Sequence, residues 1–410
     1  MNNQLKTVFV ASLGGLLFGF DMAVVSGVLP LFKVQYTLNA HLEGLFVSSA
    51  LLGCIAGVVL SAELSDRYGR KPTLIMAAVL FTMSTLICIS LTGFAHIIVG
   101  RVLTGVGIGI ASNVVPMYVS EVAPVRDRGK LVTFYQLALT LGIVLAYASN
   151  AYILQRSALL AAGDSQGLLA WLFIDEPWRG MFSIALLPSV IFLIGLYFIP
   201  ESPAWGSGLR DATFRRYAAV LKPTAHRKAM VIGLFLPIFS QLCGINVIIY
   251  YGPTVLSNAG FSLDGSLYGQ LVIGIANLLF TLIAIWKVDS LGRRPLYLAG
   301  TLGAAVSLFT ASVLFYRSAL GSEWLLLSVI GFLACFAFSI GPLKFVVASE
   351  IFPVDIRAKA MGVSILAMWV SDAFIGQVTP WLLEQIGVPL TFVLLGMVCL
   401  SAFVFVLKRL

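Results

Sequence analysis

Two amide side chains lie inside a long apolar segment that begins near residue 229. An unpaired amide in hydrocarbon costs several kcal/mol, so Gln241 and Asn246 must each face a partner or a wet cavity. On a straight helix the two side chains would point roughly 140° apart. A break at Gly244, or at Gly252-Pro253, would turn both toward one cavity. This stretch is therefore predicted to form half of a binding site for a polar solute.

The composition places this site in a membrane. The chain has 410 residues, of which 59% are hydrophobic and only 11% charged, and its mean hydropathy is +0.98. Soluble domains carry about 25% charged residues. A bilayer is crossed by about 20 apolar residues in a helix. The sequence thus predicts an all-α membrane protein of roughly twelve spans, at 7–35, 43–64, 72–94, 97–120, 129–153, 179–199, 229–257, 267–288, 295–316, 325–349, 358–383 and 388–407.

The basic residues predict the orientation of these spans. If the N-terminus is cytoplasmic, twenty Lys and Arg residues fall in inner segments and only four in outer ones. Cytoplasmic loops are enriched in Lys and Arg, so both termini are expected in the cytoplasm. The net charge of +8 is spread over these inner loops, which argues against nucleic-acid binding.

Catalytic and metal-binding patterns are not visible in the sequence. The five cysteines lie in apolar spans without the spacing of metal ligands and are interpreted as packing residues. Glycines 105, 107 and 109, like glycines 14, 15 and 19, are interpreted as close-packing surfaces of helices. We find no nucleophile triad or phosphate loop, and expect no enzyme activity, no metal and no cofactor.

An internal repeat divides the chain. The segment 65–72 after the second span resembles 289–295 after the eighth, and Ser-Glu-Val-Ala-Pro at 120–124 resembles Ser-Glu-Ile-Phe-Pro at 349–353. The predicted halves of six spans each are 1–200 and 229–410, joined by a short cytoplasmic linker at 201–228. Parallel repeats of this kind are typical of transporters that bind their solute at the middle of the membrane, between the halves.

Several motifs resemble one family. They are Asp-Arg-Tyr-Gly-Arg-Lys-Pro at 66–72, Pro-Glu-Ser-Pro-Ala-Trp at 200–205, Ser-Glu-Ile-Phe-Pro at 349–353, the glycine-rich 14–21 and Gly-Ile-Asn at 244–246. Together they resemble the sugar porter family of the major facilitator superfamily, most closely its bacterial proton-coupled pentose and hexose symporters. The resemblance implies twelve helices in two pseudo-symmetric halves, a bacterial inner membrane, a sugar or polyol and protons as partners, and a monomer.

Asp21 and Arg101 are candidates for proton coupling. Asp21 is the only acid in the first span, roughly 21 Å along a helix from its start. A bare carboxylate there is costly, so it must be protonated or paired, and Arg101 in the fourth span is a suitable partner. Protonation of Asp21 would free Arg101 and shift the conformational balance. The resemblance implies the same roles. The alternative is a static ion pair that holds two spans together.

Isolated amides in four spans are candidates for substrate binding: Gln136, Gln241, Asn246 and Asn277. An amide both donates and accepts hydrogen bonds, which suits the hydroxyls of a neutral polyol. The resemblance implies that these four positions bind sugar, that Trp369 lines the cavity and that Tyr250 and Tyr251 are gating residues. The alternatives are hydrogen bonds between helices, worth about 0.6–2 kcal/mol each, and ordinary helix packing for the aromatic residues.

The sequence departs from the family at the sugar site. Ser240, Ile143 and Met368 stand where the sugar-binding relatives carry glutamine, and Phe345 replaces a tryptophan of the tenth span. Each change removes a hydrogen-bonding group from the site.

Two charged residues appear near the same positions, Lys344 and Asp372. Asp372 follows Trp369 by three residues and so shares its helix face. Three interpretations remain open: Lys344 and Asp372 pair with each other, Lys344 extends to the cytoplasm, or both contact a charged or amino-bearing substrate.

The loop motifs carry acids and arginines that the family uses as a cytoplasmic latch. In relatives they form salt bridges between helix ends and across the halves, and exposed pairs worth about 0–1 kcal/mol suit a latch that opens in each cycle. The alternative is that the arginines only direct topology. The latch residues implied here are Asp66, Arg70, Glu121, Arg128, Glu201, Glu350 and Arg357.

The sequence thus predicts a proton-coupled symporter of a small polyhydroxylated solute that works by alternating access. A facilitative uniporter would have the same site with a silent Asp21. A carrier refitted for a charged or amino-bearing solute and a non-transporting nutrient sensor also compete with this prediction.

Overall fold

The computed structural model describes residues 2–124, 128–160, 167, 170–206, 227–287, 292–317, 323–352 and 357–410. Within these residues the chain is almost entirely helical and contains no strand. Twelve of the described helical segments are long and apolar enough to cross a membrane. They correspond to the twelve predicted spans with ends shifted by a few residues, so the predicted fold class is confirmed.

The chain forms two compact units, Met1–Phe214 and Arg215–Leu410, with six of these spans in each. The expected linker at 201–228 lies largely outside the described residues, and its bounds stay a prediction. The elements of the first unit are α1 (Asn2–Gln35), α2 (Ala40–Tyr68), α3 (Arg70–Ser90), α4 (Phe94–Val122), α5 (Arg128–Leu160), η1 (Trp171–Asp175), α7 (Pro177–Ser183), α8 (Leu186–Tyr197) and α9 (Pro203–Gly206).

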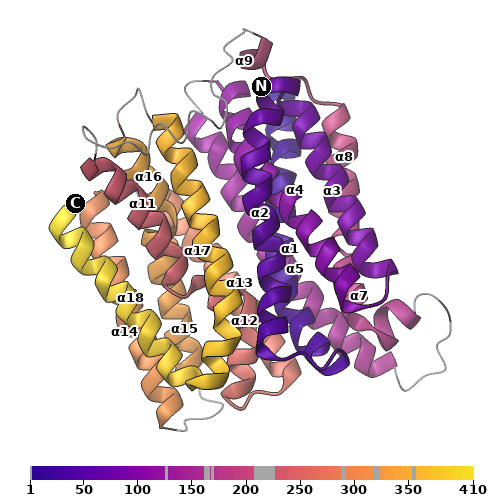
Figure 1. The fold of residues 1–410 in the computed structure, drawn as a ribbon, viewed down its shortest axis with the longest axis vertical. Helices are drawn as coiled ribbons and strands as arrows, with labels where there is room; N and C mark the ends of the chain where they lie inside the picture. The colour runs from indigo at the N-terminus through magenta and orange to yellow at the C-terminus, as the bar shows by residue number, and fades with distance from the viewer. Residues whose placement is uncertain are drawn as a thin grey trace. The chain divides into compact units, whose positions relative to one another are not determined.

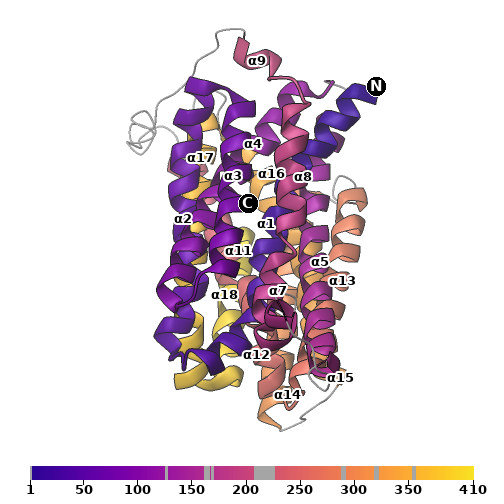
Figure 2. The same ribbon diagram turned by 90° about the vertical axis from the view of Figure 1, so that its right-hand side faces the viewer.

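The second unit repeats the six-span plan with two interrupted spans. Its elements are α11 (Arg227–Leu242), α12 (Ile245–Asn258), α13 (Leu263–Lys287), α14 (Arg293–Tyr316), α15 (Glu323–Cys335), η3 (Phe336–Ile340), α16 (Gly341–Ile351), α17 (Arg357–Gln385) and α18 (Gly387–Arg409). Within this unit α14 and α18 lie side by side, as Figure 1 shows. In the first unit α3 packs against α8 (Figure 2).

Glycines allow helix backbones of the first unit to touch. A Cβ atom placed on Gly105 of α4 would lie 1.9 Å from the Ala50 carbonyl oxygen of α2. One placed on Gly19 of α1 would lie 1.9 Å from the Leu139 carbonyl oxygen of α5. Lipid offers no hydrophobic drive between helices, so this close van der Waals contact is a main source of their association. The interpretation of these glycines as packing surfaces is confirmed, although Gly107 has more room, with a nearest distance of 3.2 Å.

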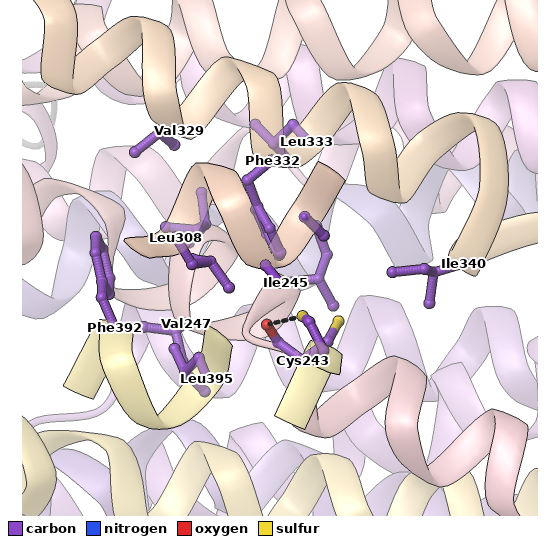
Figure 3. Close-up of a cluster of buried hydrophobic side chains, with 14 of the residues drawn as sticks. Cys243, Ile245, Val247, Leu308, Val329, Phe332, Leu333, Ile340, Phe392 and Leu395 are labelled. Atoms are coloured by element: carbon purple, nitrogen blue, oxygen red, sulfur yellow. Dashed lines mark hydrogen bonds between the residues drawn. The ribbon is translucent and has the colours of Figure 1, made fainter. Parts of the chain in front are cut away.

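The seventh span is broken at Gly244, one of the two predicted positions. Gly244 has a φ of 105°, a left-handed conformation that favours glycine, and it separates α11 from α12. Apolar side chains of α12, α14, α15 and α18 pack around the break (Figure 3), including Val247, Phe332 and Leu395. A Cβ atom on residue 244 would also lie 2.8 Å from Leu395 Cδ1. Packing therefore fixes the break in place.

We predict that Gly105→Val strongly destabilises the protein, because no side-chain rotation removes a Cβ atom from the α2 backbone. Overpacking in cores typically costs 1–3 kcal/mol, and a backbone clash of this size should exceed about 2 kcal/mol. Thermal unfolding in detergent measures the loss. Gly107→Ala is the control and should change the unfolding temperature much less. Equal effects of the two variants would contradict the assignment of Gly105 to the contact.

Candidate functional site

The break brings the two predicted amides of the second unit together. Gln241 lies at the end of α11 and Asn246 at the start of α12, and Asn246 Nδ2 donates a hydrogen bond of 3.0 Å to Gln241 Oε1. Both side chains are buried. A continuous helix would have kept them on different faces, so Gly244 creates this amide pair.

Asp372 of α17 is the third member of this cluster. Asn246 Nδ2 donates to Asp372 Oδ1 at 2.6 Å, and the Tyr250 hydroxyl lies 3.4 Å from both carboxyl oxygens. The Asp372 residue is only 3% exposed. A carboxyl group and two predicted substrate-binding or gating side chains therefore form one buried polar cluster.

Lys344 approaches the other side of the break. Its Nζ donates a hydrogen bond of 3.1 Å to Ser240 Oγ, and Ser240 in turn donates to the Pro237 carbonyl oxygen. Lys344 is 8% exposed and Ser240 is fully buried, so the lysine does not extend to solvent. Among the described residues, no ion pair of 4.0 Å or less joins Lys344 to Asp372, although their charges interact at longer range. Within the described residues Lys344 and Asp372 thus interact at longer range, and the predicted role of the two residues stays open.

The remaining predicted residues of the second unit have mixed surroundings. Trp369, three residues before Asp372, is buried. The Tyr251 hydroxyl donates a hydrogen bond of 2.6 Å to the Gly376 carbonyl oxygen. Asn277 of α13 is buried. The side chain of Phe345 lies outside the described part of the structure, so its expected role stays a prediction.

Gln270 was missed by the sequence reasoning. Its Nε2 donates to the Ile248 carbonyl oxygen at 2.8 Å and approaches that of Ile249 at 3.4 Å. Pro253 has no N–H, so the carbonyl of Ile249 lacks its usual helical donor. Gln270 therefore supports α12 where the proline interrupts its hydrogen bonds. An isolated glutamine in an apolar span, with a proline in the preceding span, was the available signal.

The first unit holds the predicted ion pair. Arg101 Nη1 lies 4.0 Å from Asp21 Oδ1 and donates to the Asp21 backbone carbonyl at 3.4 Å. The guanidinium also lies 5.8 Å from the Phe46 ring centroid. Both residues are buried, and among the described residues Arg101 Nε has no hydrogen-bond partner. The contact is long, and the guanidinium is incompletely hydrogen-bonded.

Gln136 belongs to the first unit. It lies on α5 of the first unit with an exposed side chain, and its backbone carbonyl accepts from Thr140. Its predicted role in substrate binding is neither supported nor opposed by a contact.

The loop ends of the first unit carry a dense hydrogen-bond network. Arg70 forms two bonds to the Glu121 carboxylate, at 2.9 and 3.1 Å, and lies 3.5 Å from Asp66 Oδ1. Glu201 accepts from the backbone N–H groups of Arg70 and Lys71 at the start of α3. An acceptor at a helix N-terminus satisfies N–H groups that have no partner within the helix.

The repeated motif of the second unit is less enclosed. Arg293 Nη2 lies 3.3 Å from Glu350 Oε1, with side-chain exposures of 31% and 51%. The corresponding side chains of the first unit, Arg70 and Glu121, are 9% and 16% exposed. The side chains of Arg128 and Arg357 lie outside the described residues.

Arg179 is a second residue that the sequence reasoning undervalued. It is one of the four Lys and Arg residues assigned to outer segments from the sequence, yet it is fully buried between the rings of Trp171 and Trp178, 4.5 and 4.2 Å from their centroids. It also donates to the carbonyl oxygens of Ile89 and Leu91, at the end of α3. The Trp-Arg dipeptide before the sixth span was the available signal.

These features define a class of protein. Buried amides and ionisable groups inside membrane-spanning helices mark solute or ion pathways, and two six-span units with an interrupted helix at a polar cluster are typical of secondary transporters. Among the described residues no group of three or more His, Cys, Asp or Glu could hold a metal. The fold and these clusters are those of a membrane transporter.

Comparison with known proteins identifies the family. The family described as "Sugar (and other) transporter" matches residues 7–213 and 210–410, so the chain belongs to this family of the major facilitator superfamily. The D-xylose-proton symporter of Escherichia coli is 36% identical over 93% of this chain and 87% of its own. The arabinose-proton symporter of Bacillus subtilis is 32% identical over 97% and 89%. A crystal structure of a D-xylose-proton symporter matches with a TM-score of 0.84 at 34% identity, covering 100% of this chain and 98% of that one.

We predict that Glu121→Gln lowers the thermal unfolding temperature by about 4–8 °C. The change leaves the enclosed Arg70 without its carboxylate, which should cost about 2 kcal/mol in a unit of this size. The matched control is Glu350→Gln, which removes the exposed carboxylate of the repeated motif and should cost about 0.5 kcal/mol or less. Similar losses in the two variants would contradict the distinction between the two motifs.

Proposed function

We propose that the protein is a proton-coupled symporter that carries a small neutral sugar or polyol by alternating access. The observation that carries the proposal is the buried Asp21–Arg101 contact within a family of sugar transporters. Its relatives at 36% and 32% identity are named as proton symporters of xylose and arabinose. The site supports the same chemistry, since its amides suit neutral hydroxyls.

Coupling follows from the charge of Asp21. When Asp21 binds a proton, Arg101 loses the anion that attracts it and can contact other groups. An equilibrium between two conformations shifts by the difference in free energy that the proton contributes to each. Proton binding at Asp21 thus biases the outward-open and inward-open states differently.

Substrate hydroxyls are held by the amides, and the sugar ring stacks against aromatic rings. Gln241 and Asn246 already form one hydrogen-bonded pair, which presents donors and acceptors together. Apolar ring faces suit the C–H surfaces of a sugar, and the two tyrosines of α12 gate the site. The proposed ligands and gates are Gln136, Gln241, Asn246, Asn277, Trp369, Phe345, Tyr250 and Tyr251.

The positive-inside pattern supports an orientation of the chain, and its bacterial relatives support a location. We place both termini in the cytoplasm and the chain, as a monomer, in a bacterial inner membrane. The charged loop ends then face the cytoplasm and act as the latch of the inner gate, through Asp66, Arg70, Glu121, Arg128, Glu201, Glu350 and Arg357.

A facilitative uniporter is the second candidate, because the sugar site alone does not require coupling. It predicts transport without accumulation, and Asp21 would then be a structural anion only.

We predict that Asp21→Asn abolishes uphill sugar accumulation and keeps counterflow exchange. Asparagine cannot carry the proton, yet a loaded carrier can still reorient. Proteoliposomes with an imposed pH gradient and a labelled pentose measure both activities. Asp264→Asn, at an exposed acid, is the control and should behave like the wild type. Retained pH-driven accumulation in Asp21→Asn would refute Asp21 as the proton carrier, and its absence in the wild type would favour the uniporter.

We predict that Asn246→Ala removes sugar binding and leaves the protein folded. A ligand at 100 times its dissociation constant stabilises the folded state by about 2.7 kcal/mol, which a thermal-shift assay detects. That stabilisation should disappear in Asn246→Ala. The matched control is Asn150→Ala, which removes a buried amide bonded to the Val24 carbonyl of the first unit. It should lower the unfolding temperature and keep the sugar-induced shift. A full sugar-induced shift in Asn246→Ala would remove this residue from the site.

A further inference from the structure

Two opposite charges flank the break of the seventh span. On the α11 side, Lys344 Nζ lies 3.1 Å from Ser240 Oγ. On the α12 side, Asp372 Oδ1 lies 2.6 Å from Asn246 Nδ2. Lys344 and Asp372 come from different helices, α16 and α17, and converge on positions that are six residues apart in sequence.

The directions of α11 and α12 explain why Lys344 lies on the α11 side of the break and Asp372 on the α12 side. The C-terminal end of α11 presents carbonyl groups with partial negative charge, and Lys344 is bonded to the third residue from that end. The N-terminal end of α12 presents N–H groups with partial positive charge, and Asp372 is bonded to the second residue from that end. Each charge therefore lies near a helix end of opposite partial charge and is held there by a side chain of that end.

The hydrogen bonds of the cluster leave donor and acceptor capacity for a ligand. Both N–H donors of the Asn246 amide are engaged, one by Gln241 and one by Asp372. Within the described residues, Gln241 Nε2 donates no hydrogen bond. A carboxylate has about four acceptor sites, and Asp372 uses one for a short bond and others for two long contacts with Tyr250. A hydroxyl group could donate to Asp372 and accept from the Gln241 amide at once.

The charges also cancel. A carboxylate and an ammonium on one buried cluster leave it neutral, whereas a charged solute would add an uncompensated charge at a large desolvation cost. Both groups remain suited to hydroxyls, since Asp accepts hydrogen bonds and Lys donates them. They thereby replace donors and acceptors that Ser240 and Met368 do not provide.

We propose that Asp372 and Lys344 are substrate ligands at the Gly244 break, which bind hydroxyls of a neutral sugar or polyol and exclude sugar acids and amino sugars. Asp372 accepts from one hydroxyl, and Lys344 donates to another. This inference rests on the proposed function, because it assigns specificity residues to the same site.

The test changes the charge of the site by mutation and the charge of the solute by the choice of sugar. The variants are Asp372→Asn, Lys344→Met and the double variant that combines them. The matched controls are Glu384→Gln and Lys408→Met, which remove exposed charges of the same sign. The probes are D-glucose, D-glucuronate and D-glucosamine, with the galactose series in parallel. Dissociation constants come from thermal shift and calorimetry on the full chain in detergent near neutral pH.

We expect the wild type and both controls to prefer the neutral sugar. Asp372→Asn should bind the neutral sugar about ten-fold or more weakly, the loss typical of a hydrogen bond to a charged group. It should also shift its relative preference toward the uronate by about ten-fold, because Lys344 is left uncompensated. Lys344→Met should shift in the opposite direction, toward the amino sugar. The double variant should bind the neutral sugar more weakly without a changed preference for the uronate or the amino sugar. If a single variant does not fold, the affinity of the double variant for the neutral sugar is the test.

Three results would overturn the inference. The first is unchanged neutral-sugar affinity and unchanged charge preference in the variants, which would make the two residues structural only. The second is a wild type that prefers a uronate or an amino sugar. The third is a wild type stabilised by none of a panel of neutral pentoses, hexoses and polyols. The second and third results would also overturn the proposed neutral substrate, whereas the first would leave it standing.

Discussion

The constraint on which this structure depends is that polar groups inside hydrocarbon must find partners within the protein. Water cannot hydrogen-bond to them there, so each polar residue in a span either has a partner in the protein or lowers its stability. Glycine contacts bring α1 to α5 and α2 to α4 closely enough for one backbone to touch another. That close packing leaves Asp21 and Arg101 enclosed with few partners other than each other.

The same constraint explains why polar side chains of other spans gather at a broken helix. Breaking a helix frees carbonyl and N–H groups, and the protein compensates them with side chains from other spans. Gln270 supplies α12 beside Pro253, while Lys344 and Asp372 lie at the two ends created at Gly244. The groups that stabilise the break are thus the same kind of groups that a hydroxylated solute needs. In the proposed function, stability and recognition therefore depend on one set of hydrogen bonds in this unit.

Much of the fold could be predicted from the sequence because its physics is local. Hydropathy and length define the twelve spans, and Gly244 marks the break of the seventh. The site was only partly predictable. The sequence positions of Asn246 and Asp372 do not predict their contact, because it depends on how α12 and α17 pack. Arg179 was misjudged for the same reason, because a charge near a span end looks exposed until two tryptophans enclose it.

The two repeated motifs have similar sequences and different surroundings. In the first unit, Glu121 and Glu201 bind Arg70 and the start of α3 from two sides, and the arginine is enclosed. In the second unit, Arg293 and Glu350 meet through an exposed contact. An exposed pair is worth about 0–1 kcal/mol, whereas an enclosed, multiply bonded one is costly to disrupt. The first motif therefore joins helix ends of its own unit through enclosed bonds, whereas the exposed pair of the second motif can separate at little cost.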